Sequence, residues 1–124
     1  MSLNQVHLIG NLGADPELRF TANGTAMTTF RLAVTYGFGE KQTTEWVSVV
    51  TWEKLAERVN QYLTKGSKAY VEGRLQTRSW DDKDGQKRYR TEVVANDVQF
   101  LDRKAAEAGV AVQDDLDGDE LPPF

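Results

Sequence analysis

The chain has 124 residues, 40% of them hydrophobic, and its 15 Lys and Arg stand against 19 Asp and Glu for a net charge of −4. That length suits one domain with a modest core and leaves no room for a second full domain. Without cysteine and with a single histidine, His7, a disulfide framework and a thiol nucleophile are excluded and a zinc site is nearly so, and no apolar run reaches the roughly 18 residues that span a bilayer.

Alternating apolar and polar residues, the pattern of a strand with one buried face, dominate the first hundred residues. The alternation is clearest at residues 29–35, and turn signals such as Asp15-Pro16, Asn23-Gly24 and Asp84-Gly85 separate the runs. Five strand regions are therefore predicted, at about 4–12, 29–35, 45–52, 68–80 and 87–101.

One segment between the third and fourth strand regions has helical spacing. Leu55, Val59, Tyr62 and Leu63 fall at i, i+4, i+7 and i+8, which predicts a helix with one buried face that ends at Gly66. Three strand regions, one helix and two more strands favour an all-β OB-fold, a five-stranded Greek-key barrel with its helix after strand three. A small β-sandwich is the alternative at this stage.

The pattern stops near residue 104. Residues 1–104 hold all 15 bases and 13 acids, a net +2, whereas residues 105–124 hold no base and six acids. A domain over 1–104, a short linker over 105–113 and a disordered acidic tip over 114–124 are predicted, because such a tail cannot bury enough apolar surface to fold.

Tryptophans and bases share strand faces in the predicted barrel. On the strand at 45–52, Trp46 and Trp52 lie on one face if no bulge intervenes, and on the strand at 68–80 the even positions carry Tyr70, Arg74, Arg78 and Trp80. Exposed aromatic rings can stack on any nucleobase while nearby Lys or Arg neutralises phosphates, as in binders of single-stranded nucleic acid. The alternative is that these tryptophans are ordinary half-buried sheet residues.

Several segments resemble the bacterial and mitochondrial single-stranded DNA-binding protein family, in order from about residue 3 to residue 101. They are the runs at 10–17 (GNLGADPE), 44–46 (TEW), 54–57 (KLAE), 62–67 (YLTKGS), 71–78 (VEGRLQTR) and 90–95 (RTEVVA). The acidic ending with Pro123-Phe124 also resembles the carboxy-terminal tip of bacterial members.

The resemblance implies sequence-independent binding of single-stranded DNA, with base stacking on Trp46, Trp52 and Trp80. A fourth stacking aromatic would be Tyr36 or Phe38, and Phe38 is preferred. With the strand residues above, the predicted DNA-binding set is Trp46, Trp52, Trp80, Phe38, Tyr70, Lys54, Lys65, Arg74, Arg78 and Lys87.

The resemblance further implies a homotetramer in the bacterial cytoplasm, associated with the nucleoid, that needs no cofactor or membrane. Its tip would recruit replication, recombination and repair proteins through Asp119, Glu120, Leu121, Pro122, Pro123 and Phe124. The linker is shorter than in many bacterial members, and the tip has a doubled proline. An OB-fold adaptor for primosomal or other proteins is the alternative, and catalysis is not expected because the acids at residues 81–84 fit a solvated turn.

Overall fold

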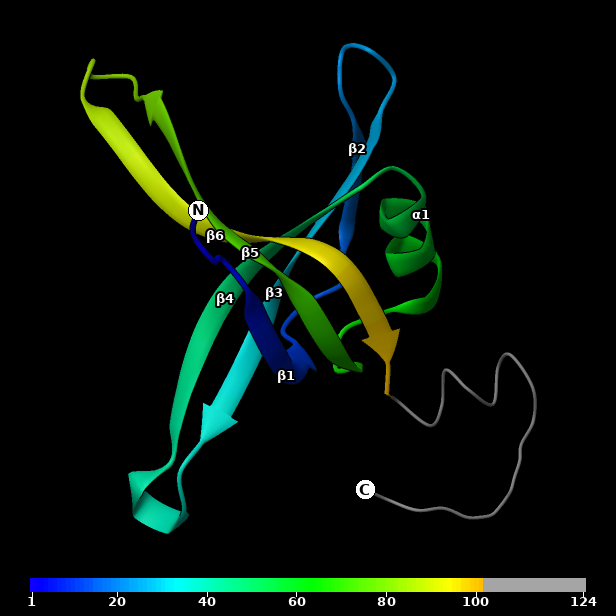
Figure 1. Ribbon diagram of the computed structural model, residues 1–124, viewed down its shortest axis with the longest axis vertical. Helices are drawn as coiled ribbons and strands as arrows, with labels where there is room; N and C mark the ends of the chain where they lie inside the picture. The colour runs from blue at the N-terminus through cyan, green and yellow to red at the C-terminus, as the bar shows by residue number, and fades with distance from the viewer. Residues whose placement is uncertain (102–124) are drawn as a thin grey trace.

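The computed structural model describes residues 1–101, which form one curved sheet with the strand order β1-β5-β6-β4-β3-β2. An additional pairing of β1 with β3 closes this sheet into a barrel. The helix lies on one side of the barrel, and the β3–β4 and β5–β6 hairpins extend away from it on the other (Figure 1). The elements are β1 (Val6–Leu12), β2 (Glu17–Phe20), β3 (Ala26–Tyr36), the 3₁₀ turn η1 (Gly39–Lys41), β4 (Thr43–Trp52), α1 (Glu53–Tyr62), β5 (Lys68–Asp81) and β6 (Lys87–Phe100).

Closure of the barrel depends on β1, which bridges two strands. Residues Val6 to Asn11 pair with β5, while Asn11 and Leu12 also pair with β3. The remaining neighbours are antiparallel except β4 and β6, which run parallel where Val49 and Val50 meet Val93 and Val94. A single sheet closed on itself confirms the OB-fold and excludes the sandwich of two separate sheets.

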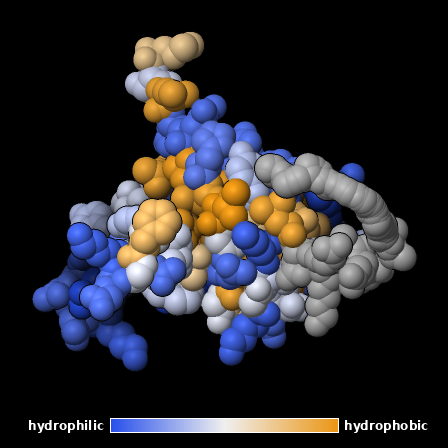
Figure 2. Space-filling view, turned by 90° about the horizontal axis from the view of Figure 1, so that it is seen from below, coloured by the Kyte–Doolittle hydropathy of each residue, from blue (hydrophilic) through white to orange (hydrophobic). Residues whose placement is uncertain are grey.

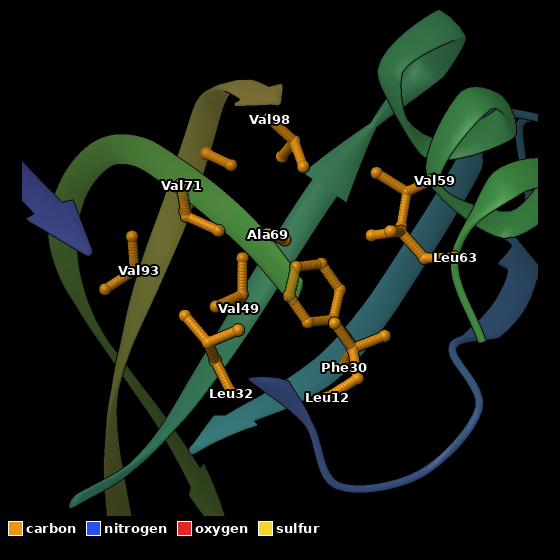
Figure 3. Packing of buried hydrophobic residues seen from close by; sticks show 11 residues of the cluster. Leu12, Phe30, Leu32, Val49, Val59, Leu63, Ala69, Val71, Val93 and Val98 are labelled. Atoms are coloured by element: carbon orange, nitrogen blue, oxygen red, sulfur yellow. The ribbon is translucent and has the colours of Figure 1, made fainter. Parts of the chain in front are cut away.

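The core fills the barrel with alternate residues of the strands and one face of α1. Phe30 and Leu32 of β3 point inward with Val49 of β4, and Val59 and Leu63 close the space from the helix side (Figure 3). Burying each such side chain contributes about 1.5 to 3 kcal/mol to stability. Some hydrophobic residues also lie on the surface of the molecule. Figure 2 shows a hydrophobic area in the middle of one face, bordered by hydrophilic residues.

The helix is confirmed, but its end differs from the prediction. Tyr62 is exposed and its ring tilts against Phe100 instead of entering the core. The helix ends at Tyr62, and Gly66, with φ +89°, lies in a separate turn that the Ser67 amide closes by donating to the Thr64 carbonyl at 3.0 Å. The sequence signal at Gly66 therefore marked a turn, not the helix C-cap.

Two strand predictions also need correction. The sheet has a sixth strand, β2, which has only four residues and no fully buried side chain, so it leaves no clear alternation in the sequence. Alternation opposite Arg74 predicts that Leu75 faces the core, but Leu75 is 50% exposed, because beyond Gly73 the β5–β6 hairpin leaves the barrel. Among residues 1–101, no helix is long and apolar enough to cross a membrane.

Candidate nucleic-acid interface

Strands β3, β4, β6 and β5 share one continuous surface on the side that faces away from the core, and we call it the outer face. Cross-strand register aligns Thr29 of β3 with Val50 of β4, Val50 with Val94 of β6, and Val94 with Arg74 of β5. Residues directly opposite each other on paired strands share a face. Alternation along each strand then places the even positions of β4, of β6 from Arg88 to Val94 and of the distal part of β5 on the outer face.

All three tryptophans occupy this face, and we call them the stacking tryptophans after the role that the sequence predicts for them. Trp46, Trp52 and Trp80 are 51%, 40% and 41% exposed, which is too open for core residues. The β3–β4 register continues without a shift from Trp46 to Trp52, so no bulge separates them. At about 3.3 Å per residue the two positions lie roughly 20 Å apart along the strand. The exposed rings are therefore spread along the surface and not gathered at one point.

A groove of about 600 Å³ crosses the outer face beside Trp46. Its lining includes four arginines and no lysine, and we call it the arginine groove: Arg19, Arg31, Arg78 and Arg90. Guanidinium groups bind phosphate oxygens bidentately and stack on flat rings, so they suit both the backbone and the bases of a nucleic acid. Carboxylates of Asp15, Glu17 and Glu92 line the same groove.

Trp46 is held from two directions. The Arg31 guanidinium carbon lies 5.4 Å from the centre of its ring, a cation–π contact. The Trp46 ring also rests against Gly13, where a methyl group would lie 2.9 Å from Cη2. The Gly13 amide in turn donates to the Arg31 carbonyl at 3.1 Å, which ties the β1–β2 connection to β3.

Trp80 has a similar arginine neighbour on its own strand. The Arg78 guanidinium carbon lies 5.6 Å from the Trp80 ring centre, and Nη2 of Arg78 donates to Oε2 of Glu92 at 3.0 Å. Glu92 is only 8% exposed, although it lies on the outer face. Arg78 is therefore fixed between a buried carboxylate and an indole ring.

Asp82 orders the turn beyond Trp80. Its carboxylate accepts hydrogen bonds from the amides of Asp84 and Gln86, both at 2.9 Å, and from Nε of Arg88 at 2.7 Å. The Arg88 bond, followed by the backbone bond from Gln86, lowers the pKa of Asp82 below its ordinary value. The acidic turn expected at Asp84-Gly85 is confirmed, with φ +81° at Gly85.

The structure brings only part of the predicted set to the groove. Trp46 and Arg78 line it, while Trp52 and Trp80 share its face at either side. Lys54 lies two residues after Trp52, at the second position of α1. Lys65 does not line the groove, but its amide donates to Oδ1 of Asp15, which does, at 2.8 Å.

Other predicted residues lie elsewhere. Tyr70 is on the part of β5 that pairs with β1, where its hydroxyl contacts Nδ1 of His7 at 2.9 Å and donates to Glu72 at 3.1 Å. Partial burial and the Glu72 bond raise the pKa of Tyr70. Lys87, at an odd position of β6, falls on the opposite side of the hairpin from Trp80. Phe38 is 91% exposed at the β3–β4 turn, away from the groove lining.

Sequence reasoning did not single out Arg31, Gly13 or Glu92. Arg31 stood at a polar position of a clear strand, which was the one available signal. Gly13 contacts Trp46 across 33 residues of sequence, and Glu92 pairs with Arg78 across 14 residues. Neither partner follows from local spacing. Within residues 1–101, no group of three or more His, Cys, Asp or Glu side chains could hold a metal ion.

Comparison with known proteins places this arrangement in a family. Residues 3–101 match the model of the single-strand binding protein family. The chain is 50% identical to single-stranded DNA-binding protein 1 of Chlorobaculum tepidum over 115 residues, covering 88% of this chain and 71% of that protein. It is 48% identical to single-stranded DNA-binding protein 1 of Xylella fastidiosa over 109 residues, covering 83% and 80%.

A solved structure agrees with the fold. The Plasmodium falciparum SSB in complex with ssDNA superposes with a TM-score of 0.75 at 32% identity, over 82% of this chain and 97% of that one. The resemblance found in the sequence is therefore confirmed, and it places the chain among binding proteins and not among enzymes. On the match over residues 3–101 and on these identities, the chain belongs to the single-strand binding protein family.

Proposed function

We propose that the chain binds single-stranded DNA without sequence preference, across the outer face. The observation that carries the proposal is the placement of three tryptophans, each at least 40% exposed, on the same sheet face as the arginine groove. Membership of the family and the fold shared with a DNA-bound relative support it.

In the proposed mode, bases stack on the stacking tryptophans and phosphates contact the unpaired cations of the groove. Stacking contributes about 1 to 3 kcal/mol per base and tolerates any base, because every base has a π-face. Arg31 and Arg90 line the groove and form no ion pair within residues 1–101, so their charges are available for phosphates. Affinity then depends on salt and hardly on sequence.

Titration with poly(dT) while following tryptophan fluorescence tests this function. Stacked bases should quench the emission of the stacking tryptophans, and raising the salt concentration should reverse the quenching. A duplex of the same length is the control, because its paired bases present no free faces to the rings. Fluorescence that stays unchanged throughout the titration would instead favour the alternative, an OB-fold adaptor that binds proteins.

We also propose that four copies assemble through β1. One edge of this strand from Val6 to Gly10 has no partner strand within residues 1–101, since only Asn11 and Leu12 reach β3. Free strand edges readily pair with a second copy. The adjoining surface carries Ile9, which is 51% exposed, and the His7–Tyr70 contact. Light scattering at micromolar concentration should give the mass of a tetramer, and a monomer would refute the assembly.

We propose, finally, that the acidic tip recruits replication, recombination and repair proteins. The tip lies outside the described residues, so the proposal rests on its sequence: five acids at 114–120 followed by Leu121-Pro122-Pro123-Phe124. Prolines reduce the entropy lost when an extended segment is captured, and acids steer it to basic partners. Deleting residues 114–124 should abolish capture of such enzymes from a bacterial lysate while leaving poly(dT) affinity unchanged or slightly raised at low salt. Undiminished capture would reduce the tail to a solubilising extension.

A further inference from the structure

Two arginines face each other in the arginine groove, and only one has a carboxylate partner. Arg78 of β5 is directly opposite Arg90 of β6, and both line the groove. Arg78 is bound by Glu92 at 3.0 Å, whereas Arg90 forms no ion pair within residues 1–101. Like charges placed directly opposite destabilise a sheet. Glu92 relieves this repulsion by neutralising Arg78.

A buried carboxylate is unfavourable in a surface that attracts phosphates. Glu92 is 8% exposed and its charge cancels that of Arg78, so the pair adds no net charge to the groove. If Arg78 served chiefly to attract the DNA backbone, Glu92 would oppose it. The ion pair is favourable if the role of the guanidinium is to stay in a fixed position as a flat group.

The Trp80 ring is what Arg78 contacts. Arg78 and Trp80 are two residues apart on β5 and so share a face, and the guanidinium carbon lies 5.6 Å from the ring centre. The indole remains 41% exposed, which leaves surface for a base. A ring supported by a pinned guanidinium loses less freedom when a base stacks on it, and preorganisation of this kind raises affinity.

We propose that Glu92 and Arg78 are positioning residues that hold Trp80 for base stacking, while Arg90 contacts the phosphates of the bound strand. The inference rests on the proposed function, since it assigns roles within the same DNA-binding surface. The two arginines of the groove then have different roles: Arg78, neutralised by Glu92, supports an aromatic ring, and Arg90 provides an unpaired positive charge.

The test compares three variants of the full chain. Arg78→Gln with Glu92→Gln removes the ion pair without changing net charge, and replacing both partners avoids leaving a buried charge alone. Arg90→Gln removes the unpaired cation from the same groove. Binding of an oligothymidine of about 8 nucleotides, within the span of one OB domain, is measured across salt concentrations. Labelling with 5-fluorotryptophan gives one ¹⁹F signal for each of the three tryptophans, and the Trp80→Phe variant assigns that of Trp80.

The double variant should bind about threefold to tenfold more weakly, the range expected for loss of a cation–π contact. Its slope of log K against log salt should equal that of the unmodified chain, and the shift of the Trp80 signal on binding should shrink. Arg90→Gln should flatten the slope by about 0.7, the value for one phosphate of a single strand, and keep the Trp80 shift. Glu92→Gln alone frees the Arg78 charge and keeps an acceptor for it, so the slope should steepen.

Two results would overturn the proposal. A double variant whose slope flattens as in Arg90→Gln would make Arg78 a phosphate ligand, and one with unchanged affinity and Trp80 signal would remove any role in binding. If the double variant fails to fold, Glu92→Gln decides, because an unchanged slope there contradicts neutralisation of Arg78. Failure of the unmodified chain to bind the oligonucleotide would instead refute the proposed function itself.

Discussion

Replacing Gly13 by alanine should weaken DNA binding while leaving the fold intact. Gly13 has no positive φ, so its backbone accepts alanine, and the obstacle is the Trp46 side chain. The added methyl group would lie 2.9 Å from Cη2 of Trp46 and closer still to Cζ3, whereas ordinary contact begins at 3.4 Å. The indole, which is 51% exposed and free to move outward, must therefore shift by more than 0.5 Å.

That shift separates the ring from the position in which Arg31 and Gly13 hold it. Stacking on one aromatic side chain contributes about 1 to 3 kcal/mol, and losing part of it should cost about 1 kcal/mol, or roughly fivefold in affinity. Quenching titrations with oligothymidine measure the affinity, and thermal unfolding measures stability, which should change little. The comparison variant is Gly10→Ala, whose methyl group would clash with the backbone carbonyl of Ala33.

Backbone cannot move aside as an exposed ring can, so Gly10→Ala should lower the free energy of unfolding by about 1 to 3 kcal/mol. Binding by its remaining folded fraction should be normal. Wild-type affinity in Gly13→Ala, or a loss of stability equal to that in Gly10→Ala, would refute the view that Gly13 serves to seat Trp46.

Three further predictions follow from the structure. Alanine in place of each stacking tryptophan should weaken binding by about 1 to 3 kcal/mol without unfolding the domain; variants that unfold, with normal binding by the folded remainder, would make these rings core residues. Glu53 has φ 58°, a conformation that costs most residues about 1 to 2 kcal/mol, so Glu53→Gly should raise the free energy of unfolding in urea by about 0.5 to 1 kcal/mol, whereas Glu57→Gly within α1 should lower it. Because the pKa of Asp82 is lowered in the folded state, its stabilising contribution exists above its unfolded pKa and is lost as pH falls through the folded value; the difference in melting temperature between the chain and Asp82→Asn should therefore vanish in acid, and a difference that persists there would contradict the role of the carboxylate charge.

Local patterns predicted the elements because alternation and helical spacing are set by burial within each element. Residues 26–32 of β3 alternate between buried and more exposed side chains, whereas β4 buries three consecutive residues, 49–51. The shared face of Trp46 and Trp52 followed from the strand period of two alone. The order of strands could not be read this way, because β1 pairs with β5 about 60 residues away. It came from matching the element sequence to a known architecture and from the family resemblance.

The exposure of Leu75 and the division of the even positions of β5 between two surfaces both come from strand curvature and from position along the barrel. Even positions of β5 were grouped as one surface, yet Tyr70 lies where β1 pairs with that strand, and Arg74 onward lies on the outer face. The register shift between Glu72 and Gly73 marks the change. A period of two gives the side of the strand but not which part of a closed sheet that side belongs to.

Charge is the other property that counting along a sequence misjudges. Residues 1–101 hold only a small excess of bases, yet the groove gathers four arginines from β2, β3, β5 and β6 around one tryptophan. Of these, Arg19 pairs with Glu17 at 3.3 Å and Arg78 with Glu92 at 3.0 Å, which leaves Arg31 and Arg90 without ion pairs in the described chain. In the proposed function, the electrostatic attraction for a DNA backbone depends on these few unpaired cations, whereas the ion-paired Arg78 supports the Trp80 ring. The salt dependence of binding to such a surface should follow the unpaired charges, and its tolerance for any base should follow the exposed tryptophan rings.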